Sequence, residues 1–319
     1  MTDEPPGADI DIRTGTARSH VRGDIGPESG DLDIYYEDMG DPNNPAVLLI
    51  MGLGAQLLLW RTDFCEKLVD QGLRVIRYDN RDVGLSTKVT GGHSGMSLPK
   101  RMVRSFLGLK SPAVYTLDDM ADDAAALLDH LEIDTAHIVG ASMGGMIAQV
   151  FAARHRPRTK TLAIIFSSNN QPLLPPPGAK QLLAILQKPK DATREALVEN
   201  AIRVTRITGS PAYPAPVDRI REEAIEGLER SYYPAGVGRH FAAILGSGSL
   251  LDYDRQINVP TVVIHGKADR LMRPFGGRAI ARAIRGARLV LFDGMGHDLP
   301  RELWDDIVGE LKTTFAEAW

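Results

Sequence analysis

One short stretch, residues 136–149 (AHIVGASMGGMIAQ), constrains the fold of this chain more than any other. Its apolar first part is typical of a buried strand, and its last part is compatible with a helix. Between them, Gly140-x-Ser142-x-Gly144 places glycines where a Cβ would clash in a tight turn. The pattern predicts a strained strand-to-helix turn that pushes the Ser142 hydroxyl clear of a sheet, beside the free N–H groups of a helix start. A plain glycine-rich turn in a parallel sheet is the alternative.

Apolar runs and helical patterns alternate along most of the chain. The predicted strands lie at 32–37, 46–50, 73–78, 161–166, 261–264 and 287–292, and the predicted helices at 60–71, 117–131 and 301–318. The continuous apolar run at 46–50 is typical of a central strand that is covered on both faces. This order predicts an α/β fold with a mostly parallel, doubly wound sheet.

The alternation stops after residue 168 and resumes near residue 253. A proline-rich segment is followed there by helical patterns near 179–188, 191–206, 216–230 and 235–246. A helical block between two strands of a parallel sheet predicts a lid over the strand ends, where such folds bind ligands. We therefore expect an α/β core of residues 31–168 and 253–319, a helical cap of residues 169–252, and a partly mobile arm of residues 1–30 with an edge strand around 10–12.

Composition and charge exclude several classes of protein. The chain has 319 residues, and its net charge of −4 is too near zero to favour nucleic acid as a partner. The single cysteine, Cys65, excludes an internal disulfide and a cysteine-based metal site. Neither an apolar run of about 18 residues nor a signal sequence is evident, which predicts no transmembrane segment and a cytoplasmic protein.

Two charged segments have more than one interpretation. Residues 100–110 (KRMVRSFLGLK) mix cations with large apolar side chains, which is compatible with peripheral contact to a membrane or with a loop beside a pocket entrance. The acids at 118, 119, 122 and 123 are typical of a solvated helix start rather than of a cation site. The sequence is also compatible with a homodimer.

A serine hydroxyl needs a base to act as a nucleophile near neutral pH, and the base needs an acid to orient it. Of the eight histidines, His297 follows the last predicted strand, at the carboxyl edge of the sheet where Ser142 must also lie. Asp269 follows the preceding strand and lies at the same edge. The chain order Ser, Asp, His is that of hydrolases with a serine in such a turn. Asp293 and Asp298 lie nearer to His297 in sequence, but adjacency does not orient an imidazole.

An oxyanion that forms at the serine needs backbone N–H donors. We expect one from Met143, directly after the serine, and one from Leu53, in the loop after the strand at 46–50. The candidate substrate-binding residues are those expected to face the reacting carbon: Gly52, Trp60, Leu271 and Met295. Apolar residues at helical spacing in the cap are candidates for the pocket wall or for the cap's own core: Leu182, Leu183, Ile185, Leu186, Phe241 and Ile244. Together these residues favour an apolar acyl or aryl group over a sugar or nucleotide.

With these residues in place, the chain from residue 30 to 319 resembles the α/β-hydrolase fold superfamily. Residues 79–86 (DNRDVGLS) are similar to the D-x-R-x-x-G-x-S loop of lidded esterases, in particular actinobacterial carboxylesterases and lipases and the aclacinomycin methylesterase type. Asp79 and Arg81 are interpreted as bracing the oxyanion loop rather than as catalytic. The sequence departs from the common pattern at Met51, where many members have a histidine before the glycine.

These observations predict a serine hydrolase of carboxylic esters, with a small-molecule or lipid ester as substrate and no cofactor or metal. Ser142 attacks the carbonyl, His297 takes its proton and is steadied by Asp269, and water cleaves the acyl-enzyme. The same machinery would serve a thioesterase, a phospholipase acting on long-chain lipids, or a perhydrolase of the cofactor-free haloperoxidase type. A non-catalytic ligand-binding protein of the same fold is the alternative from another class. Epoxide and haloalkane hydrolases are disfavoured because they carry Asp in place of Ser142.

Overall fold

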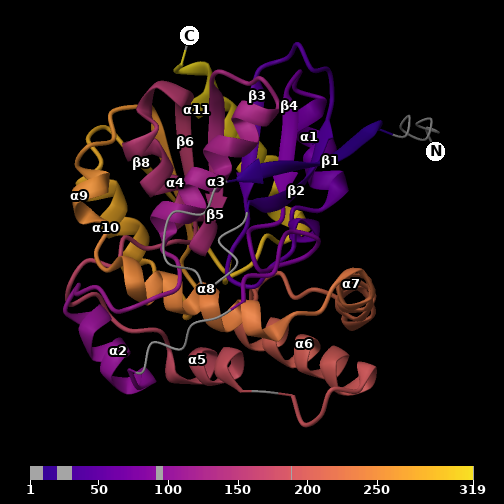
Figure 1. Ribbon diagram of the computed structural model, residues 1–319, viewed down its shortest axis with the longest axis vertical. Coiled ribbons are helices and arrows are strands. Elements are labelled where there is room, and N and C mark those ends of the chain that lie inside the picture. Colours follow the sequence, from indigo (N-terminus) through magenta and orange to yellow (C-terminus); the bar gives the residue numbers. More distant parts are fainter. Residues whose placement is uncertain (1–9, 20–30, 91–95, 188, 319) are drawn as a thin grey trace.

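The computed structural model describes residues 10–19, 31–90, 96–187 and 189–318. These residues form an eight-stranded sheet in the order β1-β2-β4-β3-β5-β6-β7-β8 (Figure 1). Its strands are β1 (Ile12–Ser19), β2 (Leu32–Met39), β3 (Ala46–Ile50), β4 (Arg74–Tyr78), β5 (Ala136–Ala141), β6 (Thr159–Ile165), β7 (Thr261–Gly266) and β8 (Arg288–Phe292). The two pairs that involve β2 are antiparallel, and the other pairs are parallel. The predicted α/β fold with a mostly parallel sheet is therefore confirmed.

Alternate side chains of the central strands pack into two cores, one on each face of the sheet. In β3, Leu48 and Ile50 belong to the first core, and Val47 and Leu49 belong to the second, as the two-residue period of a strand requires. Helices α3 (Leu117–His130), α4 (Met143–Arg154) and α10 (Phe275–Ala283) cover the first core, whereas α1 (Thr62–Val69) and α11 (Trp304–Ala316) cover the second. Because both faces are buried, β3 is apolar along its whole length.

The edge of the sheet extends further than the sequence indicated. The edge strand expected around residues 10–12 is the eight-residue strand β1, which pairs with β2 from Ile12 opposite Met39 to Ser19 opposite Leu32. Ala17 and Ser19 are buried on the side of this hairpin that meets α3. Strand β1 is thus held by its pairing with β2 and by its contact with α3. The rest of the expected arm, residues 1–9 and 20–30, lies outside the described residues.

Between β6 and β7 the chain leaves the sheet; we call residues 169–252 the inserted block. Its helices are α5 (Ala179–Leu186), α6 (Arg194–Thr208), α7 (Val217–Arg230), α8 (Pro234–Ser247) and α9 (Leu251–Asp254). The first four lie where the sequence predicted four helices. Figure 1 shows α5–α8 grouped with α2 (Leu98–Phe106) below the sheet. Helices α6 and α7 pack on each other through a small core of Val198, Ile202 and Ile220.

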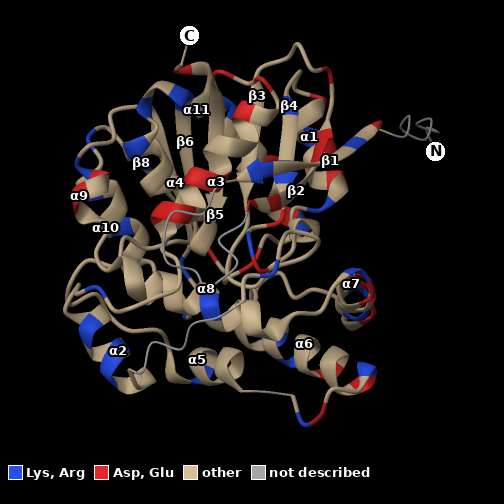
Figure 2. Cartoon of the chain, viewed as in Figure 1, with Lys and Arg blue, Asp and Glu red and all other residues tan. Residues whose placement is uncertain are grey.

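Helices α2 and α7 expose different surfaces (Figure 2). Charges of both signs cover α7, whereas α2 carries three cations, no acid and no buried residue. Val103 and Phe106 of α2 are exposed, so this segment presents the mixture of cations and apolar side chains that its sequence contains. Contact of α2 with a membrane surface stays a prediction. Among the described helices, none is both long enough and apolar enough to cross a bilayer.

Candidate active site

Ser142 lies in the tight connection between β5 and α4. Its backbone has φ +56° and ψ −120°, a combination that costs a residue other than glycine about 1–3 kcal/mol. Hydrogen bonds hold the strained residue on both sides. Its N–H donates to the Ile165 carbonyl at 3.0 Å, and Ser167 Oγ donates to its carbonyl at 2.6 Å. The neighbouring strand β6 and the residues after it therefore fix the direction of the serine side chain.

The two glycines around Ser142 are required by close approach of the backbone. A Cβ at Gly140 would lie 2.2 Å from the Gly144 carbonyl oxygen, and one at Gly144 would lie 2.1 Å from the Ile50 carbonyl oxygen. Both distances are far shorter than a carbon can approach an oxygen without displacing backbone. The glycines thus let α4 start directly against β3 and β5. They avoid the clash that the sequence pattern predicted for any residue with a Cβ at these positions.

His297 lies between Ser142 and Asp269. Its Nε2 is 2.9 Å from Ser142 Oγ, and its Nδ1 is 2.7 Å from Asp269 Oδ2. The strands β5, β7 and β8 run parallel in the sheet, and the three residues follow them at their carboxyl ends. The side chains form one hydrogen-bonded chain, in which the serine hydroxyl donates to Nε2 and Nδ1–H donates to the carboxylate.

Asp269 is buried and fully hydrogen-bonded. Its Oδ1 accepts the N–H groups of Leu271 at 2.8 Å and Met272 at 2.9 Å. Burial alone would raise the pKa of Asp269, but the charge of His297 and hydrogen bonds from His265 and His297 outweigh burial and bring the pKa down to about 2. The carboxyl is therefore ionised near neutral pH. A permanent acceptor at Nδ1 keeps that proton in place and leaves Nε2 free to receive another.

The loop that carries His297 is attached to the inserted block. The His297 N–H donates to the Thr208 carbonyl at the end of α6, at 2.9 Å. The preceding Gly296 N–H donates to Ser210 Oγ at 2.8 Å, and the Ser210 hydroxyl donates to Asp298. The end of α6 thus contributes to the position of the imidazole.

Two backbone N–H groups lie beside the serine, at Leu53 and Met143. Both residues line the same cavity as Ser142. Within the described residues, no loop or side-chain acceptor receives either N–H. Gly52 approaches the serine so closely that a Cβ there would lie 3.1 Å from Ser142 Cβ. Leu53 and Met143 are the two residues expected to donate to an oxyanion, and that role stays a prediction.

An apolar cavity of about 210 Å³ opens beside Ser142. Its walls include Leu271 and five of the six apolar residues expected from the inserted block, which are Leu182, Ile185, Leu186, Phe241 and Ile244. The sixth, Leu183, is 65% exposed. The walls also include Met102 and Phe106 of α2, in agreement with the interpretation of 100–110 as a segment beside a pocket entrance. Further wall residues that the sequence did not single out are Met146, Leu174 and Met272.

Two of the four expected substrate-binding residues are core residues instead. Trp60 is fully buried and stacks on Phe64 with ring centroids 5.7 Å apart, and Met295 is buried in the same second core. Neither lines the cavity. A loop at the carboxyl edge of the sheet can direct a side chain into the core as well as toward a ligand, and both of these side chains pack in the core. Of the other two, Leu271 lines the cavity and Gly52 lies against Ser142 through its backbone.

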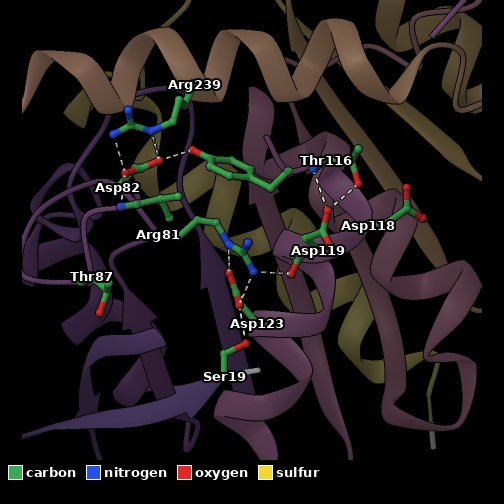
Figure 3. A network of polar contacts seen from close by, with 12 residues as sticks. Ser19, Arg81, Asp82, Thr87, Thr116, Asp118, Asp119, Asp123 and Arg239 are labelled. Carbon is green, nitrogen blue, oxygen red and sulfur yellow. Dashed lines mark hydrogen bonds and ion pairs between the residues drawn. The ribbon is translucent and has the colours of Figure 1, made fainter. Parts of the chain in front are cut away.

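The loop at 79–86 belongs to a buried polar network (Figure 3). Arg81 donates to both carboxylate oxygens of Asp123 on α3, at 2.6 and 2.7 Å. Asp82 accepts two hydrogen bonds from Arg239 on α8, at 2.7 and 2.9 Å. Asp79 accepts two backbone N–H groups, each at 2.8 Å. These contacts join the loop to α3 and to the inserted block, and none of them reaches the cavity beside the serine.

The other acids at the start of α3 also have partners. Asp119 forms a capping box with Thr116, and Asp118 accepts the hydroxyl of Tyr253. Asp122 pairs with Arg154 at the end of α4 and lies 2.9 Å from Nε2 of His155. In the part of the chain that the structure describes, no three side chains of His, Cys, Asp or Glu are grouped so that they could hold a metal ion.

Residues 45–300 match the family model described as alpha/beta hydrolase fold. The chain is 27% identical to the rhodomycin D methylesterase DnrP of Streptomyces peucetius, over 85% of this chain and 90% of that protein. It is 25% identical to the bifunctional esterase/perhydrolase DCH of Acinetobacter calcoaceticus, over 84% of this chain and 91% of that protein. A solved structure with a similar fold is the enol-lactonase from Burkholderia xenovorans LB400, with a TM-score of 0.65 and 23% identity over 89% of this chain and 97% of that one.

Proposed function

This chain belongs to the alpha/beta hydrolase fold family, and on that premise we propose that it is a carboxylic ester hydrolase that forms an acyl-enzyme on Ser142. The observation that carries the proposal is the hydrogen-bonded chain from Ser142 Oγ through His297 to Asp269. A base within hydrogen-bonding distance turns a serine hydroxyl into a nucleophile. The similarity to a methylesterase and to an esterase/perhydrolase supports an ester as the substrate class.

In the proposed reaction, Ser142 Oγ attacks the ester carbonyl carbon while His297 Nε2 takes the hydroxyl proton. The imidazolium is stabilised by the carboxylate of Asp269 and then gives the proton to the leaving alcohol. A water molecule, activated by the same Nε2, attacks the acyl-enzyme and releases the acid. Because the pKa of Asp269 is about 2, its carboxylate can play this part at any pH near neutrality.

The negative oxygen of each tetrahedral intermediate is held by the N–H groups of Leu53 and Met143. Both lie beside Ser142, and neither is used by a loop or side-chain acceptor among the described residues. The N–H of Met143 is also at the start of α4, where the helix dipole favours negative charge. Donors of this kind are worth about 10²–10³ in kcat each.

We also propose that the inserted block is a cap that selects the substrate. Its helices α5 and α8 supply apolar walls of the cavity, so an apolar acyl or aryl group fits there better than a sugar or nucleotide. The cavity volume of about 210 Å³ is smaller than most sites for drug-sized ligands. A short or medium acyl chain is therefore favoured over a long one.

The test is hydrolysis of p-nitrophenyl esters, from acetate to dodecanoate, by the wild-type protein and by Ser142→Ala. The matched control is Ser231→Ala at the end of α7, which removes a hydroxyl outside the cavity. We expect kcat/KM to fall by at least about 10³-fold in Ser142→Ala and to stay at the wild-type value in the control. The best substrate should be an ester with a short or medium acyl chain.

Two results would contradict the proposal. Wild-type turnover that persists in Ser142→Ala would show that another group is the nucleophile. Tight binding of esters without turnover by either protein would show a ligand-binding protein of the same fold.

A further inference from the structure

The side chain of His240 on α8 reaches the loop that carries Leu53 and Gly54. Its ring is fully buried, and each ring nitrogen meets a backbone group of the core. The Gly54 N–H donates to Nδ1 at 3.1 Å, and Nε2 lies 2.6 Å from the Arg81 carbonyl oxygen. A carbonyl can only accept, so Nε2 carries the proton. The neutral ring is then left with Nδ1 as the acceptor for Gly54.

The Gly54 N–H belongs to the central peptide of a tight turn over residues 52–55. The Ala55 N–H donates to the Gly52 carbonyl at 3.3 Å, and Gly54 has φ +65°, as the third residue of a type II turn requires. The central peptide of such a turn is the one that can flip between turn types. A hydrogen bond to its N–H therefore selects one of the two arrangements. The N–H of Leu53 shares a peptide plane with the Gly52 carbonyl, which accepts from Ala55 at the other end of the same turn. The orientation of the Leu53 N–H therefore follows the position of the turn.

The other side of His240 is attached to a rigid part of the core. Arg81, whose carbonyl accepts from Nε2, is held by both oxygens of Asp123. Its neighbour Asp82 is held by Arg239, the residue before His240 on α8 (Figure 3). The imidazole thus links the turn at 52–55 to the loop at 79–86. That loop cannot shift without breaking its ion pairs with Asp123 and Arg239.

We propose that His240 is a positioning residue for ester hydrolysis: through the Gly54 N–H it holds the turn at 52–55 so that the Leu53 N–H stays directed at the oxyanion. The inference rests on the proposed function. It assigns to the inserted block a part in the chemical step, in addition to lining the cavity. The expected effect of losing the bond is on kcat rather than on KM, because the oxyanion exists only after attack.

The test compares two substitutions that each keep one of the two hydrogen bonds. In His240→Asn, the side-chain oxygen can replace Nδ1 as acceptor for Gly54, but the side chain is too short to reach Arg81. In His240→Gln, the side-chain NH₂ can replace Nε2 as donor to Arg81, and the acceptor for Gly54 is lost. The matched control is Gly238→Ala on the same helix, where an added Cβ has no neighbour within 4 Å.

We expect kcat for a p-nitrophenyl ester to fall by about 10- to 100-fold in His240→Gln, with KM changed by less than about threefold. His240→Asn and the control should keep kcat within about threefold of wild type. Both His240 variants should lose a similar amount of thermal stability. Equal kcat values in the two variants, whether both low or both unchanged, would overturn the inference, because a purely structural role does not distinguish the two bonds.

A second measurement uses the wild-type protein, so it does not depend on whether a variant folds. In wild-type protein with ¹⁵N-labelled histidine, the ring of His240 should appear by NMR as the neutral Nε2–H tautomer, and an Nδ1–H tautomer would overturn the inference. The proposed function fails separately, when wild-type turnover is absent or survives in Ser142→Ala. In that case no oxyanion forms at Ser142 and the role of His240 is overturned with it.

Discussion

Substituting Gly52 with alanine adds a single methyl group between the turn at 52–55 and the candidate nucleophile. The new Cβ would lie 3.1 Å from Ser142 Cβ, 3.3 Å from the Ala141 carbonyl oxygen and 3.5 Å from Ser142 Oγ. The first two distances are a few tenths of an ångström shorter than an ordinary contact. Ser142 cannot yield, because hydrogen bonds to its N–H and carbonyl hold its strained backbone. The turn must therefore move away from the serine.

That displacement acts on the N–H of Leu53, the residue after Gly52. Donors to an oxyanion work at about 2.7–3.1 Å, and complete loss of one lowers kcat by about 10²–10³-fold. A shift of a few tenths of an ångström weakens the bond without removing it, so we expect kcat to fall by about 10- to 100-fold, or about 1.4–2.7 kcal/mol in the transition state. Overpacking of this size costs about 1–3 kcal/mol of stability, which lowers Tm by several degrees.

The assay is kcat and KM for a p-nitrophenyl ester, with Tm measured on the same preparations. Gly309→Ala on α11 is the control, because the added Cβ there has no neighbour within 4 Å, and its kcat should equal that of wild type. A fall in Tm with kcat unchanged would refute the assignment of a donor to this turn. A raised KM with kcat unchanged would show that the methyl group only narrows the cavity.

Three further predictions concern buried carboxyl groups. In Asp269→Asn the group facing Nδ1 of His297 is no longer an anion, so kcat near neutral pH should fall by about 10³–10⁴-fold, measured with the same esters. Burial raises the pKa of Asp254 to about 7, above its value in the unfolded chain, so this carboxyl lowers the stability of the fold as pH rises from about 4 through 7. In thermal melts, Asp254→Asn should therefore raise Tm at about pH 8 and leave it unchanged near pH 4. An equal shift of Tm at both pH values would contradict the raised pKa. Arg81→Met leaves Asp123 buried without its cation and should cost about 3–5 kcal/mol in urea unfolding, whereas adding Asp123→Leu should recover most of that loss; no recovery in the double variant would contradict the pairing.

Local patterns in the sequence were sufficient for the frame of the fold. The glycines around Ser142 predicted a tight turn because the clash they avoid involves only β5, α4 and the adjacent strand. The apolar run of β3 predicted a strand that is buried on both faces, and its side chains do divide between two cores. The carboxyl ends of parallel strands brought Asp269 and His297 to the serine, because the parallel order follows from alternating strands and helices. The family resemblance that these motifs carried is confirmed.

What the sequence did not predict depends on contacts between distant segments. Strand β1 has a polar sequence, and its full length is evident only from its pairing with β2. Trp60 and Met295 lie in loops at the correct edge, but whether a loop side chain faces a ligand or the core depends on the packing beneath it. His240 reads as one more residue on an amphipathic helix. Its two hydrogen bonds reach residues 159 and 186 positions away, and no pattern in α8 indicates them.

The attachment of α6 to the loop of His297 has a consequence for how this protein could be re-engineered. Thr208 and Ser210 bond the backbone beside the imidazole, so the inserted block is not a separable module that can be exchanged whole between relatives. A chimera that imports a foreign block would lose these bonds and should be impaired even when its new cavity fits the substrate. Helix α5 makes no such bond and supplies three walls of the cavity, at Leu182, Ile185 and Leu186. Substitutions intended to change substrate specificity are therefore best made in α5. The end of α6, with Thr208 and Ser210, should be left unchanged.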